Sequence, residues 1–335
     1  MNNARYNKGL KEIGNGIYAY LQPDGSWGWS NAGLIADSGK SLLVDTLYDQ
    51  PLTATMLKAI EHATTIKPHD INTLVNTHAN GDHTWGNGIL KNAEIIASKE
   101  TAEQMREEIS PQMMVNMLLN AKNMGEAGEF ILENFSGFSW EGLEVTMPTK
   151  TFEGTMDLKI GHKEVRLQNV GPAHTDGDTL VYVPDDKIIY TGDILFIDGT
   201  PVIWSGPISN WIKACDYILS LDVDVIVPGH GPITDKNGVK QVREYLNYIA
   251  VESRKRYDAG MSFNDAANDI ALGHFGKWTD TERIVINVFS QYKEFNKENT
   301  KAEVPDIIEL LKLMQQYKNN KCKNKNHINP KQCNC

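Results

Sequence analysis

Four side chains that are able to bind a metal ion lie within one short segment of the chain: His78, Asn80, Asp82 and His83. The segment follows the apolar run Ile71–Asn76, which is typical of a β-strand, so we expect these side chains to converge at the carboxyl end of that strand. Burying so many polar groups is costly unless a partner satisfies them. A divalent metal ion suits imidazole nitrogen and carboxylate oxygen, whereas a hydrogen-bonded turn is the alternative interpretation of this segment alone.

Three more potential ligands each follow a short apolar run further along the chain. His174 comes after one such run, Asp193 follows Ile188–Tyr190, and His230 follows Val225–Val227. Glycine or proline stands near each of them, which lets the backbone turn sharply and approach a site closely. Four segments of this kind predict one metal centre at the edge of a sheet.

The order of these motifs, from about Gly14 to Pro232, resembles that of the metallo-β-lactamase superfamily. The resemblance implies an α/β (α+β) fold, namely a four-layer αββα sandwich with the metal site at the edge between its two β-sheets. It also implies a role for each ligand. First-metal ligands would be His78 and His174, second-metal ligands would be Asp82, His83 and His230, Asp193 would bridge both metals or bind the second, and Asp45 would support the ligands from behind.

Asn80 departs from the family pattern, because the usual motif has histidine at this position. An amide is a much weaker zinc ligand than an imidazole, so the first site is reduced while the second keeps all its ligands. We therefore expect one firmly bound zinc ion and a second that is weak or absent. For Asn80 itself two interpretations stay open: a hydrogen bond that orients a ligand or the loop, or direct contact with metal or substrate.

This motif variant, together with the loop Tyr20–Trp27, resembles a branch that contains hydrolytic dehalogenases of the chlorothalonil type. The resemblance implies a hydrolase that replaces an aromatic chloride with hydroxide from zinc-bound water. Among other hydrolase substrates, the acidic chain and the missing histidine disfavour phosphodiesters, so we expect a small, largely apolar halide, ester, thioester or lactone.

Asp82 or Asp193 would orient the hydroxide and accept the proton that water loses. Asn80, together with His78 and His174 where no metal occupies them, would hydrogen-bond the substrate or the developing anion. Trp27 and Trp204 are candidates for the apolar wall of a substrate pocket, although core packing is the alternative for both.

Other functions remain open within and beyond hydrolases. A β-lactamase-type amide hydrolase is disfavoured because Met1–Leu10 lacks the apolar core of a signal peptide. A di-iron redox or sensor protein is disfavoured because nothing after Pro232 resembles a flavin-binding domain. A structural zinc protein would show a closed shell of four ligands.

The chain predicts three parts: residues 1–235 as a metallo-β-lactamase-like domain, 236–317 as a helical extension, and 318–335 as a flexible tail rich in lysine, asparagine and cysteine. Helical spacing supports the extension at Val239–Arg254, Phe263–Leu272, Asp280–Phe295 and Val304–Met314. Within the domain, Lys99–Met124 predicts a long helical segment with four methionines, either packed on the core or acting as a lid over an apolar ligand.

Composition narrows the partners of this 335-residue chain, which has 43 acidic and 33 basic residues. Its net charge of −10 disfavours nucleic acid, so we expect a small-molecule substrate. No apolar run approaches the length of a membrane span, so we expect no membrane partner and a cytoplasmic location. The amphipathic C-terminal helices are compatible with a homodimer. Cys215 is expected in the core, and Cys322, Cys333 and Cys335 in the frayed tail.

Overall fold

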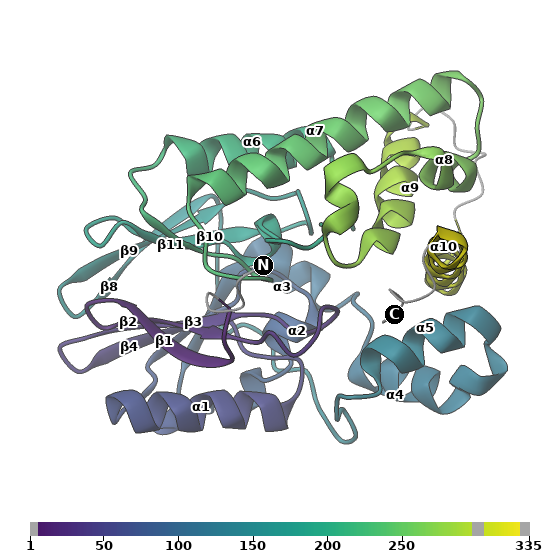
Figure 1. Ribbon diagram of the computed structural model, residues 1–335. Coiled ribbons are helices and arrows are strands. Elements are labelled where there is room, and N and C mark those ends of the chain that lie inside the picture. Colours follow the sequence, from purple (N-terminus) through teal and green to yellow (C-terminus); the bar gives the residue numbers. More distant parts are fainter. Residues whose placement is uncertain (1–5, 297–304, 329–335) are drawn as a thin grey trace.

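Two β-sheets lie face to face at the centre of the computed structural model, which describes residues 6–296 and 305–328 (Figure 1). The first sheet has seven strands in the order β1 (Gly9–Gly14), β2 (Ile17–Leu21), β3 (Ala32–Asp37), β4 (Lys40–Val44), β5 (Thr73–Val75), β6 (Glu94–Ser98) and β7 (Lys150–Phe152). The second has five strands in the order β12 (Val225–Val227), β11 (Ile188–Tyr190), β10 (Thr179–Val183), β9 (Lys163–Asn169) and β8 (Thr155–Ile160). Side chains of both sheets form one buried cluster, among them Leu42, Val75, Leu167 and Val181.

Helices cover the outer face of each sheet and complete a four-layer αββα arrangement (Figure 1). On the seven-stranded sheet, α1 (Gln50–Thr64) buries Met56, Leu57 and Ile60. On the five-stranded sheet lie α6 (Ile208–Ser220) and α7 (Lys236–Asp258), and Cys215 of α6 is fully buried as expected. All residues of β10 are buried because one face of this strand packs on the other sheet and the opposite face on helices. The predicted fold class is therefore confirmed.

Three short helices stand between β6 and β7, where the sequence predicts one long helical segment. They are α3 (Lys99–Gln104), α4 (Pro111–Asn120) and α5 (Gly125–Phe135). The segment is interrupted because a residue before proline disfavours helical geometry, and Ser110 instead caps α4 by accepting a hydrogen bond from the Met113 amide at 3.2 Å. The chain between α3 and α4 therefore forms a loop, and Glu108 and Ile109 of this loop lie close to the metal centre.

The C-terminal region is helical, as predicted, and lies beside α5 (Figure 1). It contains α8 (Phe263–Asp269), α9 (Ile284–Phe295) and α10 (Ile307–Ile328), and the 3₁₀ helices η6 (Gly273–Lys277) and η7 (Thr281–Arg283) lie between α8 and α9. The last helix packs against α5 and α9, which connects the end of the chain to the helices between β6 and β7.

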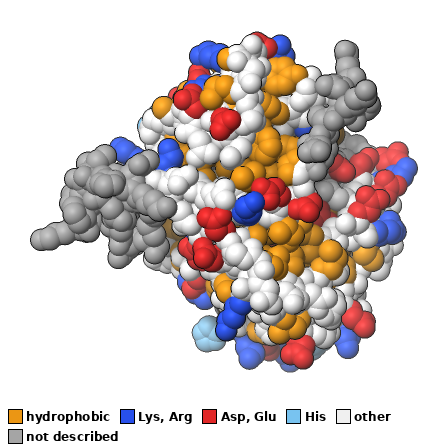
Figure 2. Space-filling view, turned by 90° about the vertical axis from the view of Figure 1, so that its right-hand side faces the viewer, with side chains coloured by type: hydrophobic (Ala, Val, Ile, Leu, Met, Phe, Trp, Pro, Cys, Tyr) orange, Lys and Arg blue, Asp and Glu red, His pale blue; other side chains and the backbone are white. Residues whose placement is uncertain are grey.

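The start of the expected tail, residues 318–328, is helical in α10. Cys333 and Cys335 lie outside the described residues, and the side chain of Cys322 is not among those described. Figure 2 shows this end of the molecule, where hydrophobic side chains alternate with charged groups; exposed apolar residues include Met113 and Leu119 of α4. Within residues 6–296 and 305–328, every helix is too short or too polar to span a bilayer.

Candidate metal centre

The six ligands implied by the resemblance come together where strands of the two sheets end. His78 follows β5, Asp193 lies in η5 (Gly192–Ile194) directly after β11, and His230 follows β12. Since β4 and β5 run parallel in one sheet and β11 and β12 run parallel in the other, their carboxyl ends meet at one edge of the sandwich. The short helix α2 (Gly81–Thr84) carries Asp82 and His83 to the same edge.

Two overlapping groups of side chains have ligand atoms within reach of a single metal ion. We call Asp82, His83 and His230 the outer cluster, and His78, His83 and Asp193 the inner cluster. In the outer cluster, His230 Nε2 lies 3.3 Å from Asp82 Oδ2, and also 3.3 Å from Asp193 Oδ2. In the inner cluster, Asp193 lies 3.1 Å from His83 Nε2 and 3.7 Å from His78 Nε2. Asp193 therefore stands between the two clusters.

Three buried atoms at the centre find no hydrogen-bond partner among the described residues: His78 Nε2, His83 Nε2 and Asp193 Oδ1. A buried polar atom without a partner is costly, and native proteins satisfy almost all of them. Imidazole nitrogen and carboxylate oxygen are ligands that zinc prefers. The donor set and its unmet hydrogen bonds thus fit a divalent metal ion.

Asp45, which directly follows β4, holds the ligands from behind. Its carboxylate accepts hydrogen bonds from the backbone N and Oγ1 of Thr77, both at 2.7 Å, and lies 2.9 Å from His83 Nδ1. His174 is held in a similar way, because its Nδ1 donates to the Val202 carbonyl at 2.7 Å. In both rings Nδ1 is occupied and Nε2 faces the centre, which is the arrangement of a metal-binding histidine.

The electrostatics of the centre favour neutral imidazoles on one side and charged groups on the other. Burial lowers the pKa of His174 to about 4 and places the pKa of His78 well below its usual range. Burial also opposes a charge on His230, but Asp193 and Asp82 outweigh it and raise its pKa to about 9. In the absence of a metal ion, positive charge is therefore drawn to the carboxylates Asp82 and Asp193.

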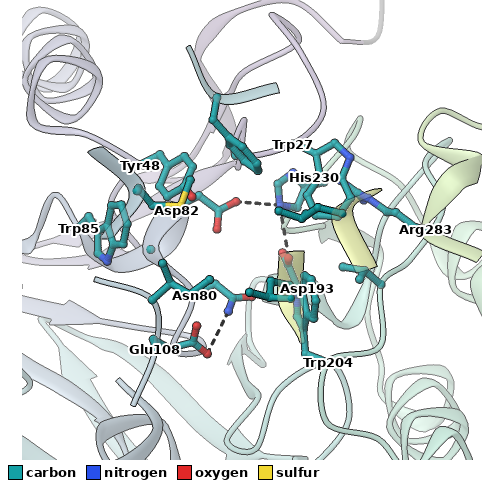
Figure 3. A pocket seen from close by; sticks show the side chains of 18 of the residues that line it. Trp27, Tyr48, Asn80, Asp82, Trp85, Glu108, Asp193, Trp204, His230 and Arg283 are labelled. Carbon is teal, nitrogen blue, oxygen red and sulfur yellow. Dashed lines mark hydrogen bonds and ion pairs between the residues drawn. The ribbon is translucent and has the colours of Figure 1, made fainter. Parts of the chain in front are cut away.

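Asn80 and His174 form a separate contact beside the two clusters. Asn80 Oδ1 lies 2.8 Å from His174 Nε2, and Asn80 Nδ2 donates to Glu108 Oε1 at 3.4 Å (Figure 3). His174 lies 3.3 Å from Asp193 but belongs to neither cluster. Because His174 Nδ1 donates to Val202, Nε2 of the neutral ring carries no proton, so its contact with Asn80 Oδ1 is not a hydrogen bond. Of the two interpretations of Asn80, the structure shows a hydrogen bond to the loop before α4.

A cavity of about 320 Å³ opens onto these side chains. Trp27 and Trp204, the two tryptophans singled out in the sequence, both line it, together with Asn80 and four of the predicted ligands. A group of apolar lining side chains comes from α4, α5, α10 and the loops around them: Ile109, Met114, Met117, Ile131, Phe135, Ile307 and Leu311. The cavity therefore has a polar end at the metal centre and an apolar end among helices.

The C-terminal region reaches the cavity through η7. Trp27 Nε1 donates to Glu282 Oε1 at 3.0 Å, and the guanidinium of Arg283 lies 4.2 Å from the centre of the Trp27 ring. Sequence reasoning missed Arg283, and also Tyr48 and Glu108, which line the same cavity. These residues belong to no metal-binding motif, so only the packing of distant segments brings them to the site.

Comparison with known proteins decides the family. The model of the metallo-beta-lactamase superfamily matches residues 25–230 of this chain. The chain belongs to this superfamily. The matched region holds all six predicted ligands and the strands that carry them, whereas α7 to α10 lie beyond it.

Two curated relatives show how diverse the superfamily is. The chain is 32% identical to the alpha subunit of 2,4-dinitroanisole O-demethylase from Nocardioides sp. over 88 residues, which cover 24% of this chain and 26% of that protein. It is 23% identical to the beta-lactamase-like protein 2 homolog of Caenorhabditis elegans over 226 residues, which cover 68% of this chain and 63% of the relative. The chain thus spans less than two thirds of either relative.

A solved structure is similar over most of the chain. The stereoselective inverting sec-alkylsulfatase from Pseudomonas sp. matches with a TM-score of 0.64 at 15% identity, covering 89% of this chain and 52% of that chain. At this identity the likeness concerns the fold. Its coverage extends past residue 230, so the fold similarity includes part of the C-terminal helical region.

Proposed function

We propose that this protein is a zinc-dependent hydrolase that acts on a small, largely apolar substrate. The observation that carries the proposal is the cavity itself, because it joins a group of metal-binding side chains to a wall of apolar ones. A structural zinc site would instead be closed on all sides. The exposed fractions of Asp82 and His230, 14% and 12%, leave one side of the outer cluster open to the cavity.

The zinc ion would be held by Asp82, His83, Asp193 and His230, with a second ion bound more weakly near His78 and His174. When bound, zinc lowers the pKa of water and supplies hydroxide at neutral pH. Asp82 is placed to orient the attacking water and to accept its proton, since its carboxylate borders both His230 and the cavity. Asn80 faces the same space and is placed to contact the substrate.

The apolar end of the cavity favours an aromatic or aliphatic body on the substrate. An activated halide, as in the dehalogenase-like branch, or an ester, thioester or lactone combines such a body with a bond that hydroxide can cleave. The two tryptophans support this class, because Trp27 and Trp204 pack 6.4 Å apart along the wall and offer flat apolar surfaces beside the metal centre.

Elemental mass spectrometry on dialysed protein, combined with turnover assays on chloroaromatic, ester, thioester and lactone substrates, tests the proposal. We expect a single zinc ion per chain and hydrolysis of at least one of these substrates, lost after chelation and restored by zinc. Asp82→Ala should lose both zinc and turnover, whereas Asp222→Ala, at an exposed position, should keep both. Two iron ions per chain, or zinc and turnover retained in Asp82→Ala, would contradict the proposal.

A further inference from the structure

Glu108 is a carboxyl group in the cavity wall that the metal centre does not use. It lies in the loop between α3 and α4, where its Oε1 accepts hydrogen bonds from Gln104 Nε2 at 3.0 Å and from Asn80 Nδ2 at 3.4 Å. No arginine, lysine or histidine among the described residues forms an ion pair with it. The carboxyl group is therefore held in place by two amides and carries no compensating charge.

The position of Glu108 is at the boundary between the two ends of the cavity. Asn80 and Asp82 lie on its polar side, and Ile109 follows it in the chain towards the apolar side. In Figure 3 the Glu108 carboxyl group lies below the Asn80 amide, on the opposite side of the cavity from Arg283. A substrate with its reacting bond at the metal centre and its apolar body among the helices would pass directly beside this carboxyl group.

The surroundings of Glu108 bring its pKa into the neutral range, where both its protonated and its ionised forms are present. Burial raises its pKa to about 7, the negative charges of Asp176 and Asp82 add to this effect, and the hydrogen bond from Gln104 opposes it. A carboxyl group with a pKa near the working pH is suited to proton transfer. Tyr48 is another ionisable side chain of the cavity, but burial raises its pKa well above its usual range, which makes it a poorer acid.

We propose that Glu108 donates a proton to the leaving group in the hydrolysis proposed above. Hydroxide oxygen forms a bond to the electrophilic atom of the substrate, and the bond to the leaving group breaks with its electron pair on the leaving atom. The carboxyl proton of Glu108 passes to that atom, which leaves a carboxylate. Solvent then returns to Glu108 the proton that water lost when hydroxide formed, so the net reaction consumes one water molecule.

The alternatives on the cavity wall are less suited to this step. Asp82 and Asp193 belong to the groups that would hold the zinc ion, and a carboxylate that binds zinc has no proton to give. Arg283 donates to the Thr200 carbonyl at 2.9 Å, and a guanidinium does not release a proton at neutral pH. Glu108 is thus the cavity side chain that combines an available proton with a place beside the substrate.

The test rests on the proposed function and compares two acetate esters on zinc-loaded protein. Phenolate is a basic leaving group that needs a proton, whereas 4-nitrophenolate departs readily without one. In Glu108→Gln we expect kcat for phenyl acetate to fall by about 100-fold, the usual scale of general acid catalysis, and kcat for 4-nitrophenyl acetate to change by less than about 3-fold. Glu107→Gln, at the exposed neighbouring position, should match the wild type on both esters.

The pH profile adds a readout that a merely structural role would not produce. Wild-type turnover of phenyl acetate should fall as pH rises through about 7, because Glu108 then loses its proton, and this fall should be absent in Glu108→Gln. An equal loss on both esters, or no loss on phenyl acetate, would overturn the inference while the proposed function stands. If zinc-loaded wild-type protein cleaves neither ester, the proposed function fails for esters and the inference with it.

Discussion

The two sides of the metal centre are built from different kinds of groups. The outer cluster joins Asp82 to His83 and His230, and Asp45 holds His83 from behind at 2.9 Å. On the other side, His174 faces the amide of Asn80 at 2.8 Å, where the superfamily pattern has a histidine. We therefore expect the position beside Asn80 to bind a metal ion more weakly than the outer cluster, because an amide is a poorer ligand than an imidazole.

The largest difference in zinc affinity should be seen between two variants that each lack one histidine, one on either side of the metal centre. His83→Ala removes a member of both clusters, and we expect it to lower zinc affinity by more than about 100-fold, beyond the loss typical of supporting residues. His174→Ala should keep the firmly bound zinc ion, because His174 belongs to neither cluster. Competition titration with a chromogenic chelator measures both, with the exposed His62→Ala as control. Equal loss of zinc in the two variants would show that both sides bind alike.

A smaller effect is expected from the support behind the outer cluster. Asp45→Asn replaces a carboxylate that fixes His83 Nδ1 with an amide of similar shape, so zinc affinity should fall by about 10- to 100-fold. The fold should persist, because the φ angle of residue 45 is 61° and asparagine tolerates this left-handed conformation. The same titration applies, with exposed Asp157→Asn as the matched control. Unchanged affinity would mean that Asp45 does not position the ligand.

The smallest expected effect on metal binding comes from a substitution that gives the side of His174 the histidine it lacks. Asn80→His supplies the missing imidazole, and we expect a second metal ion to bind about 10-fold more tightly than in the wild type, because imidazole is a better zinc ligand than an amide. Titration with Co²⁺, followed by its visible absorption, counts the sites. Asn80→Ala is the control and should bind a single ion. A second site of equal strength in all three proteins would show that residue 80 does not set metal number.

The strands and the ligands were predictable because their signals are local. Short apolar runs such as Ile188–Tyr190 match a strand, here β11, residue for residue, and each ligand follows a strand in the chain. Glu108 was missed because it lies in a stretch read as continuous helix, where the break depends on Ser110 and the proline after it. Arg283 was missed because it reaches the cavity only through the packing of η7 on Trp27, 256 positions earlier. Residues that bind metal carry a motif, whereas residues that shape a cavity do not.

The hydrogen bond from Trp27 to Glu282 ties the wall of the cavity to a part of the chain outside the region that the superfamily model matches. The ligands lie inside that region, and η7 and α10 lie outside it. Mutations in the C-terminal helices are therefore able to alter the shape of the cavity while every ligand stays in place. This division allows substrate specificity to change during evolution while the metal ligands stay the same. It also makes α10 the first helix to mutate in a search for variants with a new substrate specificity.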